Sequence, residues 1–380
     1  MKEPLRVLNV TTVLRAAGIE SFIMNMYRNI DREKVQFDFM VMRDEKEFYD
    51  DEIKKLGGKK FTIHVHSKNT LIKILKESRE LYKFLKNNHY SVVHIHYTTP
   101  LRAFYLLAAK KAGVPVRIYH SHSAEVSGKS SAKLAIYSFC REKINKWATD
   151  FFACSKAAAQ WMYVKEGLEK SEVIYNGIDI NKFKFDENVR KEVRKELNME
   201  NNFIIVHTGR FLEQKNHKFV IEIFKSLKKK CPKAKLLLLG TGDLVDDMKK
   251  LVEKYSLSGD VEFLGVRSDV NRILNAADCY VMPSLYEGLP VAAVEAECSG
   301  LPCILSTNIT KEVALTNKVK FLDLDENIEN WCQTILKLKD NPRMDCSNDI
   351  KKSGYDVHEV ALNLQKFYEN SAKVYIQNAE

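Results

Sequence analysis

Two glutamates in an apolar stretch are the residues of this sequence best suited to ligand chemistry. Glu287 and Glu295 lie eight residues apart within residues 279–305, and the residues between them are mostly apolar. Because an ionised carboxylate is costly to bury without a partner, each side chain is expected to have one. Hydroxyl groups of a sugar or a ribose would suit, since carboxylates accept hydrogen bonds from them.

A helix is expected to begin just after Glu287. Pro290 suits its first position, because the ring fixes a helical φ and the missing N–H costs nothing there. The free N–H groups and the positive dipole end around Gly288 and Leu289 would attract phosphate oxygens. The stretch is therefore interpreted as a site for a phosphorylated, hydroxyl-rich ligand. The alternative is that both glutamates, including Glu295 inside the helix, are capping or surface residues.

A second group of candidate residues follows the strand predicted at residues 203–208. Gly209 and Arg210 come directly after the strand, and Lys215 precedes the next helix. A guanidinium can bind phosphate oxygens through two hydrogen bonds, and an ammonium can neutralise them. The alternative is two solvated surface cations in a chain that has 60 Lys and Arg residues.

Two histidines end the strand predicted at residues 116–122. His120 and His122 are expected to lie where ligands of parallel sheets bind, or else to be satisfied structural residues. The small, polar segment that follows, residues 123–131, is expected to be a loop near the site. Gly18 ends the turn between the first strand and the first helix, where a glycine lets a ligand approach the backbone.

Strands and helices alternate along the chain, which predicts parallel, doubly wound sheets. A boundary between two domains is expected in residues 173–179, where Asn176-Gly177 indicates a turn. The predicted strands are residues 5–10, 37–42, 61–65, 91–96, 116–122, 150–155, 203–208, 235–240, 261–265, 280–282 and 303–305. The predicted helices are residues 18–28, 71–85, 101–112, 130–149, 186–197, 327–339 and 357–376, together with one from Pro290 to before Gly300.

Taken together, the motifs resemble those of the family-4 retaining glycosyltransferases, which have the GT-B fold. The segment from Glu287 to Glu295 is similar to the paired-glutamate signature of that family, residues 209–216 to its diphosphate clamp, and residues 173–179 to its hinge. The resemblance implies two doubly wound, Rossmann-like α/β domains that face a central cleft. Residues 1–175 would form the acceptor-side domain, completed by a helix at about 358–380, and residues 176–357 the domain that binds the nucleotide sugar.

The resemblance also implies roles for individual residues. Arg210 and Lys215 would stabilise the leaving diphosphate, Glu287 would bind the hydroxyls of the donor sugar, and Glu295 would hold the ribose. His122, or as a second choice His120, would contact the donor sugar. The catalytic set is thus Glu287, His122, Arg210 and Lys215, and the substrate-binding set is Gly18, His120, Asn176, Gly209, Gly240, Leu264, Gly288, Leu289, Pro290 and Glu295. The family usually has a Gly-Gly pair where this chain has Ala17-Gly18.

Composition limits the remaining possibilities. The chain has 380 residues, enough for two domains, and no stretch approaches the ~20 apolar residues of a membrane helix. Its start does not have the form of a signal peptide, and its 8 cysteines are scattered without a CxxC pair, so a reduced, cytoplasmic protein is expected. Asp323-Leu324-Asp325 imitates a metal-binding DxD motif, but it is expected to be a loop, and neither a metal nor another cofactor is expected.

The positive charge is unevenly distributed. Residues 1–175 contain 30 Lys and Arg against 19 Asp and Glu, whereas the rest of the chain contains 30 against 31. This excess favours contact with an anionic partner such as a membrane surface or a lipid pyrophosphate, or it serves solubility. A nucleic-acid-binding protein is an alternative function, although the chain has no P-loop and no basic stripe interleaved with aromatics, so no nucleic-acid partner is expected.

The expected reaction is metal-independent, retaining transfer from a nucleotide sugar, in particular a UDP-sugar, to a lipid-linked or glycan acceptor in bacterial surface-polysaccharide synthesis. The expected location is the cytoplasm, with peripheral attachment to the inner face of the cell membrane. A nucleotide-sugar epimerase of the same fold is the second alternative. It would need acid and base residues around the sugar and no groove for an acceptor.

Overall fold

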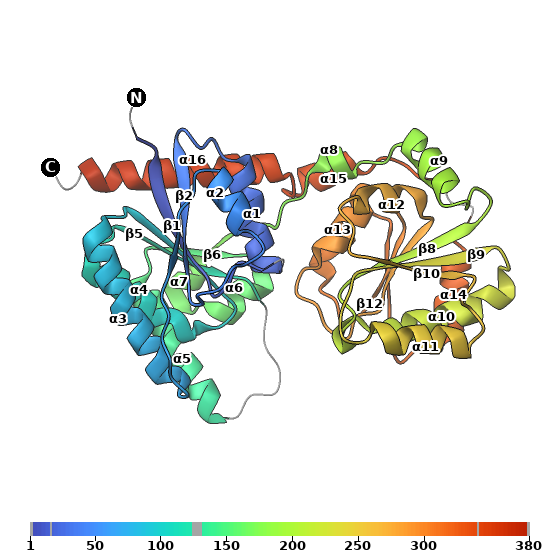
Figure 1. The fold of residues 1–380 in the computed structure, drawn as a ribbon, viewed down its shortest axis with the longest axis horizontal. Helices are drawn as coiled ribbons and strands as arrows, with labels where there is room; N and C mark the ends of the chain where they lie inside the picture. Colours follow the sequence, from blue (N-terminus) through green and yellow to red (C-terminus); the bar gives the residue numbers. More distant parts are fainter. Residues whose placement is uncertain (1–2, 16, 124–130, 340–341, 378–380) are drawn as a thin grey trace. The chain divides into compact units, whose positions relative to one another are not determined.

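The computed structural model describes residues 3–15, 17–123, 131–339 and 342–377. By their contacts the residues form two compact units, one of Met1–Gly177 with Val357–Glu380 and one of Ile178–Asp356 (Figure 1). The division after Gly177 lies within residues 173–179, two residues beyond the end expected for the first domain at residue 175. Most of the loop expected at residues 123–131 lies outside the described residues.

The first unit is built on a parallel sheet, which has seven strands in the described part of the chain. Its order is β3-β2-β1-β4-β5-β6-β7, so the direction of winding changes between β1 and β4. The strands are β1 (Leu5–Val10), β2 (Val35–Val41), β3 (Lys60–Thr62), β4 (Val92–Tyr97), β5 (Val116–Ser121), β6 (Asp150–Ala153) and β7 (Glu172–Val173). No strand is expected from the sequence between residues 155 and 203, with residues 150–155 as the last strand of the first half, and β7 shows that this expectation is wrong. β7 has two partly exposed residues, too few for an apolar pattern.

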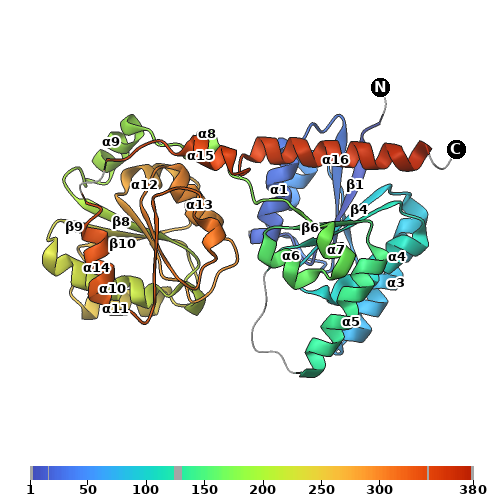
Figure 2. The same cartoon turned by 180° about the vertical axis from the view of Figure 1, so that it is seen from behind.

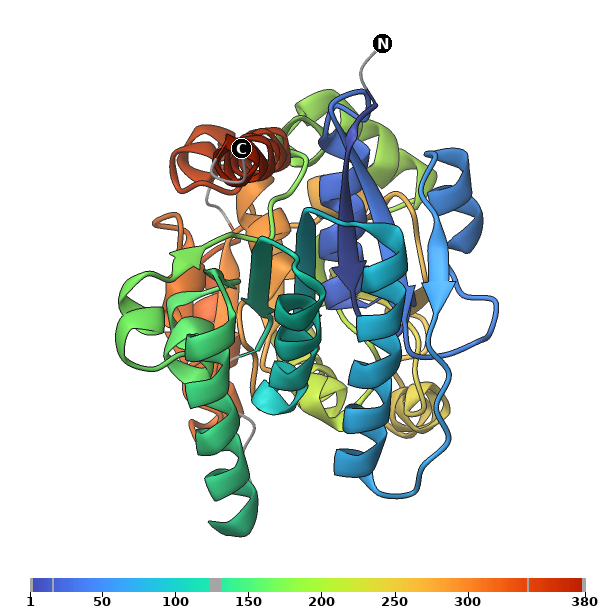
Figure 3. The same ribbon diagram turned by 90° about the vertical axis from the view of Figure 1, so that its left-hand side faces the viewer.

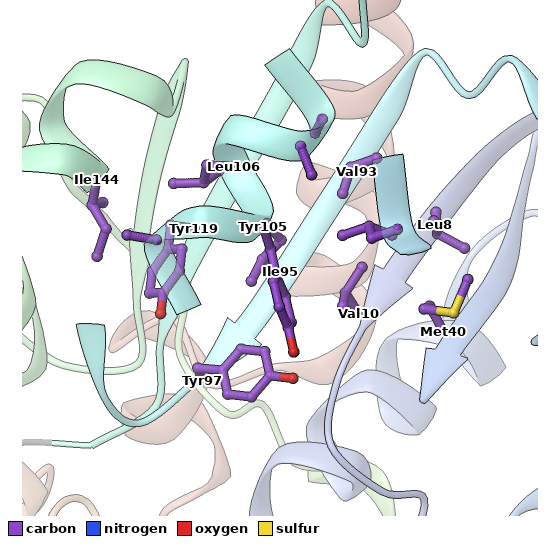
Figure 4. Packing of buried hydrophobic residues seen from close by; sticks show 14 of the residues in the cluster. Leu8, Val10, Met40, Val93, Ile95, Tyr97, Tyr105, Leu106, Tyr119 and Ile144 are labelled. Carbon is purple, nitrogen blue, oxygen red and sulfur yellow. The ribbon is translucent and has the colours of Figure 1, made fainter. Parts of the chain in front are cut away.

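Helices cover both faces of this sheet. On one face α3, α4 and α5 pack in an apolar core that includes Val10, Ile95 and Tyr105 (Figure 4). On the other face α1, α2 and α16 surround a core that includes Tyr27 and Tyr368, and α16 lies beside α1 (Figure 2). The helices are α1 (Gly18–Asn29), α2 (Asp50–Lys55), α3 (Thr70–Asn88), α4 (Ala103–Ala112), α5 (Ser131–Trp147), α6 (Lys156–Met162), α7 (Lys165–Glu169) and α16 (Val357–Gln377), with a 3-10 turn at Pro100–Arg102.

The second unit repeats this design. Its described residues form a six-stranded sheet in the order β10-β9-β8-β11-β12-β13, with all pairs parallel. The strands are β8 (Phe203–Thr208), β9 (Ala234–Leu239), β10 (Val261–Gly265), β11 (Cys279–Met282), β12 (Cys303–Ser306) and β13 (Val319–Leu322). The helices are α8 (Ile180–Phe183), α9 (Glu187–Glu196), α10 (His217–Lys230), α11 (Val245–Lys254), α12 (Val270–Ala276), α13 (Val291–Cys298), α14 (Ile328–Leu336) and α15 (Ser347–Lys352), with 3-10 turns at Glu213–Lys215 and Lys311–Val313. The prediction of two doubly wound α/β domains is confirmed.

One local expectation about α13 is wrong. Pro290 does not begin the helix but precedes it, with φ −74° and ψ 106°. An extended ψ of this size lies outside the helical region, so Pro290 turns the chain into the helix rather than forming its first residue. In the described part of the chain, no helix is both long and apolar enough to cross a membrane.

Candidate active site

The two strongest sequence motifs lie at adjacent strand ends in the second unit. β8 and β11 are neighbours at the point where the winding of the sheet reverses. The segment 209–216 follows β8, and the segment 283–290 follows β11. Open α/β sheets bind ligands at this reversal, beyond the carboxyl ends of the strands. The topology therefore brings the candidate cations and Glu287 to the position where a ligand is expected.

An ion pair joins the two motifs directly. Lys215 Nζ lies 2.5 Å from Glu287 Oε1, and the two side chains are 18% and 10% exposed. The stem of Lys215 crosses Gly209, where a Cβ atom would lie 3.1 Å from it. The glycine therefore gives the lysine room to reach the carboxylate. Neither group is a freely solvated surface charge, which was the alternative for both.

The backbone around Glu287 is held from two sides. Gln214 donates from Nε2 to Tyr286 O at 2.9 Å and accepts from Leu285 N at 2.8 Å. From the side of β12, Ser306 Oγ donates to Ser284 O at 2.6 Å. These bonds fix the loop between β11 and α13, so Glu287 is presented from a braced backbone rather than from a free loop.

Arg210 contrasts with Lys215. Its side chain is exposed and forms no hydrogen bond or ion pair with any residue that the structure describes. The backbone beside it is tightly packed, because a Cβ atom on Gly240 would lie 2.0 Å from Gly209 O. Gly240 also has φ +132°, which side chains disfavour. The ends of β8 and β9 can thus meet closely only with glycine at position 240. The guanidinium of Arg210, by contrast, is available to a ligand.

Glu295 lies in the second turn of α13, partly buried. Burial raises the pKa of its carboxyl group from 4.5 to about 7, and the charge of Lys182 opposes this rise. Glu295 and Glu287 both act electrostatically on Tyr280, whose hydroxyl lies 2.9 Å from Thr208 Oγ1.

Glu297, two residues further along α13, is a buried carboxylate that the sequence reasoning did not consider. It is fully buried, and its Oε2 accepts hydrogen bonds from Leu315 N at 3.0 Å and from Thr316 N at 2.9 Å. Burial raises its pKa to about 8. Glu297 thus braces a loop from within the helix, whereas the side chain of Glu295 forms no hydrogen bond to a described residue.

β10, which contains Leu264 of the predicted substrate-binding set, has an irregular end. The register of β10 against β9 shifts between Phe263 and Gly265, which places Leu264 at the irregularity. Beyond it, Gly240 N donates to Gly265 O at 2.8 Å. Because Leu264 interrupts the ladder, its backbone is a suitable candidate for contact with a base.

In the first unit, four histidines form a compact cluster. His94 and His96 lie on β4, and His120 and His122 lie at the end of β5, with His96 opposite His120 in the register. His96 Nδ1 lies 3.0 Å from His122 Nε2, and His94 Nε2 lies 3.2 Å from His120 Nδ1. Phe22 of α1 packs on three of the rings, so the helix that begins at Gly18 covers the cluster.

Both ends of the cluster are anchored. His94 Nδ1 lies 2.7 Å from the hydroxyl of Tyr368 on α16, and His96 Nε2 lies 3.1 Å from Asn9 Oδ1. Because a carbonyl oxygen only accepts, His96 carries its proton on Nε2, and His122 donates to His96 from its own Nε2. Burial lowers the pKa of His122 to about 3. His122 is therefore a neutral, oriented ring at the mouth of the cluster.

The comparisons with known proteins agree with this geometry. Residues 16–182 match Glycosyltransferase Family 4, and residues 189–357 match Glycosyl transferases group 1. The putative glycosyltransferase EpsF of Bacillus subtilis is 34% identical over 97% of both chains. The chain belongs to this family of glycosyltransferases.

Two further proteins show how widely the likeness extends. A UDP-Gal:alpha-D-GlcNAc-diphosphoundecaprenol alpha-1,3-galactosyltransferase of Escherichia coli is 29% identical over 79% of this chain and 80% of its own. The crystal structure of HepE from Anabaena, in complex with UDP, aligns with a TM-score of 0.78 over 96% of this chain and all of that chain, at 17% identity. This second likeness shows the fold.

The structure groups most of the predicted site residues of this glycosyltransferase by unit. His120 and His122 belong to the histidine cluster of the first unit, and Gly18 begins the helix whose Phe22 packs on it. Asn176 precedes Gly177, the last residue of the first segment of that unit. The others lie at the strand ends and on α13 of the second unit: Gly209, Arg210, Lys215, Gly240, Leu264, Glu287, Gly288, Leu289, Pro290 and Glu295. His94 and His96 were missed, although histidines two residues apart on a strand share a face and could have been recognised.

Two groups of side chains in this glycosyltransferase raise the question of a metal. Nitrogens of His94, His96 and His120 lie within 4.8 Å of one another, which would suit an ion by distance. These histidine rings also form hydrogen bonds with one another, with Tyr368 and with Asn9. The short distances are therefore equally those of a hydrogen-bonded network. Asp323 lies in a turn after β13, as expected, and its Oδ1 accepts from Asp325 N at 2.9 Å.

Proposed function

We propose that this glycosyltransferase moves a sugar from a UDP-sugar to a lipid-linked or glycan acceptor in surface-polysaccharide synthesis. The proposal includes transfer with retention of the anomeric configuration and without a metal ion. The observation that carries it is the pair of Lys215 and Glu287 at the reversal of the second sheet. The exposed Arg210 follows β8 at the same edge and pairs with no residue in the described ranges. A cation and a carboxylate at one strand end match the two halves of a nucleotide sugar, an anionic diphosphate and a hydroxylated ring.

In this proposal each residue has one task. Arg210 and Lys215 stabilise the negative charge that develops on the diphosphate as it leaves. Glu287 accepts hydrogen bonds from the donor sugar, and Glu295 accepts them from the ribose. His122 binds the sugar near its anomeric carbon. The choice of uracil as the base is supported by the Escherichia coli relative, whose name includes UDP-Gal, and by the UDP complex of HepE.

The acceptor is assigned to the first unit and the donor to the second. The Escherichia coli relative, named for a diphosphoundecaprenol acceptor, supports a lipid-linked acceptor here. The excess of 30 cations over 19 acidic residues in residues 1–175 supports attraction to the anionic inner face of the cell membrane. A cytoplasmic enzyme attached peripherally to that membrane would meet both substrates.

Metal independence is supported by the groups at the diphosphate position. A metal ion in such enzymes would bridge phosphate oxygens, and Arg210, Lys215 and the start of α13 already supply positive charge there. Retention is supported by the family resemblance alone.

The test is transfer from a panel of UDP-sugars to an undecaprenyl-diphosphate saccharide in excess EDTA, with the anomeric coupling of the product read by NMR. We expect activity to persist and an α-linked donor to give an α-linked product. Activity lost in EDTA and restored by manganese would contradict the metal-independent mechanism. A β-linked product would contradict retention.

A further inference from the structure

A cluster of exposed apolar side chains marks one end of two helices in the first unit. Fourteen large hydrophobic residues are exposed in the described part of the chain, and six of them lie on α3 and α5, with exposed fractions of 37% to 52%. We call these six residues the α3–α5 patch: Leu71, Ile72, Leu75, Leu134, Ile136 and Phe139.

Four of the six patch residues, Leu71, Leu75, Ile136 and Phe139, line a cavity. Its volume is about 380 Å³, and side chains of α3, α4 and α5 line it, including Leu75, Phe104 and Phe139. The lining residues are apolar throughout, apart from the thiol of Cys140. Such a cavity offers a ligand almost no hydrogen-bond partner, so it suits hydrocarbon rather than a sugar or a nucleotide.

The two helices that carry the patch are rich in positive charge. α3 and α5 together carry nine Lys and Arg residues against three Glu residues. One of the three, Glu77, is fully buried and paired with Arg102, so its charge does not face solvent. Lys143 Nζ lies 4.8 Å from the centre of the Phe139 ring, which places an ammonium beside the apolar surface. The cations are Lys73, Lys76, Arg79, Lys83, Lys86, Lys133, Arg141, Lys143 and Lys146.

The patch also has a defined place in the fold. Five of its residues lie in the first two turns of α3 and α5, and Phe139 lies in the third turn of α5. Figure 3 shows the ends of these two helices, in blue and green, reaching past the sheet. In a doubly wound unit the helices run opposite to the strands, so helix starts lie at the carboxyl edge of the sheet. His122 follows β5 at that same edge.

We propose that the α3–α5 patch docks on the surface of a bilayer that contains anionic lipids. The six apolar side chains enter the boundary between headgroups and acyl chains, and the lysines and arginines of the two helices contact lipid phosphates. The inference deepens the proposed function and rests on it, because a lipid-linked acceptor would then be met at the edge of the sheet that ends in His122.

Charge and chemistry favour a bilayer over two other occupants. A second copy of the chain would place its nine cations against nine others, and that repulsion disfavours pairing through the patch. RNA would use the cations, but it is bound through bases stacked on aromatic rings, and Phe139 is the sole aromatic residue among the six. Anionic lipid uses both the apolar surface and the positive charge of the two helices.

The experiment is sedimentation of the full chain with vesicles of phosphatidylcholine, alone or mixed with phosphatidylglycerol. The apolar variant is Leu75→Ser with Phe139→Ser. Its control is Leu362→Ser with Phe48→Ser, which changes the same residue types at exposed positions elsewhere in the first unit. We expect binding to the anionic vesicles, about tenfold weaker for the apolar variant and unchanged for its control.

A second pair of variants tests the charge. Lys76→Glu with Lys133→Glu reverses two cations near the patch, and Lys54→Glu with Lys366→Glu makes the same change of net charge elsewhere on the unit. Each cation near an anionic surface contributes about fivefold in binding, so the first variant should lose at least about twentyfold and the second much less. Thermal unfolding of each variant checks that the fold is retained.

Three outcomes would overturn the proposal. The first is equal vesicle binding by the patch variants and their controls. The second is a change of oligomeric state in the patch variants without a change in vesicle binding. The third is that RNA displaces the protein from vesicles, and that this displacement depends on the patch residues. UDP binding and transfer to a short, water-soluble acceptor test the proposed function separately. If they persist while vesicle binding is absent, the docking surface is wrong and the enzyme assignment stands.

Discussion

At the scale of single residues, Lys215 is the group with the most specific contacts. Its ammonium is paired with Glu287, while the side chain of Arg210 has no partner among the residues that the structure describes. We predict that Lys215→Ala and Arg210→Ala each weaken binding of UDP more than binding of uridine. A charge-assisted hydrogen bond contributes about 1.5–3 kcal/mol, so losses of roughly tenfold to a hundredfold are expected by calorimetry. Lys218→Ala, an exposed lysine on α10, is the control. Equal losses for UDP and uridine would place the diphosphate elsewhere.

Glu287 should behave differently from its partner. In Glu287→Gln the lysine loses its competitor, so UDP should bind at least as tightly as in the parent protein. Transfer should nevertheless slow by roughly tenfold or more, because the amide is a weaker acceptor for the sugar hydroxyls. Measuring UDP affinity and the turnover rate of the same variant separates the two effects. A parallel fall in both would mean that Glu287 only maintains the local structure.

Glu295 predicts a pH dependence for nucleoside binding. Its pKa of about 7 means that the carboxylate, which accepts hydrogen bonds from the ribose in our proposal, becomes protonated as the pH falls below 7. The affinity for uridine should therefore decrease from pH 8 to pH 6, and Glu295→Gln should remove this dependence. Uridine is used because it lacks the titrating phosphates of UDP. A pH profile that persists in Glu295→Gln would assign the dependence to another group.

At the scale of elements, the histidines of β4 and β5 link stability to pH. Burial keeps the pKa values of His94, His96 and His120 well below 6.5, and that of His122 at about 3. The unfolded chain therefore binds more protons than the folded chain below about pH 6.5, and stability falls as the pH decreases. Each histidine contributes up to about 1.4 kcal/mol per pH unit.

The measurement is thermal or urea unfolding between pH 8 and pH 5. In His96→Asn the free energy of unfolding should fall less steeply with decreasing pH, by about the contribution of one histidine. The substitution should also lower stability at pH 8. His89→Gln, an exposed histidine, should leave the slope unchanged. A slope that stays the same in His96→Asn would show that acid stability depends on other groups.

Long helices and strands could be predicted from the sequence, because their apolar patterns extend over several residues, whereas very short ones could not. The alternation of long apolar strands and helices predicted both sheets, and the paired motifs predicted the strand ends that meet at β8 and β11. β7 was missed because it has only two residues, both partly exposed, and two residues cannot show an alternating apolar pattern. The ion pair of Lys215 with Glu287 could not be foreseen, because the two residues lie 72 positions apart and only the strand order brings them together.

At the scale of the whole molecule, the two units should respond separately to ligand. Almost all of the proposed donor contacts lie within Ile178–Asp356. We expect UDP at ~100 times its dissociation constant to stabilise the unit that binds it by about 2.7 kcal/mol. Calorimetry of the full chain should then show one unfolding transition that moves with UDP and one that does not. Transitions that move together would indicate that the units unfold as one.

The pairing of Lys215 with Glu287 has a consequence for turnover. An inorganic anion that takes Lys215 from this pair leaves the carboxylate unmatched, so we expect bare phosphate to bind weakly. A UDP-sugar offers its diphosphate to Lys215 and its sugar hydroxyls to Glu287, so the two side chains can separate and each still has a partner. Once the sugar has been transferred, UDP can still satisfy the lysine but no longer the glutamate, and the carboxylate competes to recapture its cation. We therefore expect the ion pair of Lys215 and Glu287, which gives way to the UDP-sugar, to re-form after transfer and promote the release of UDP.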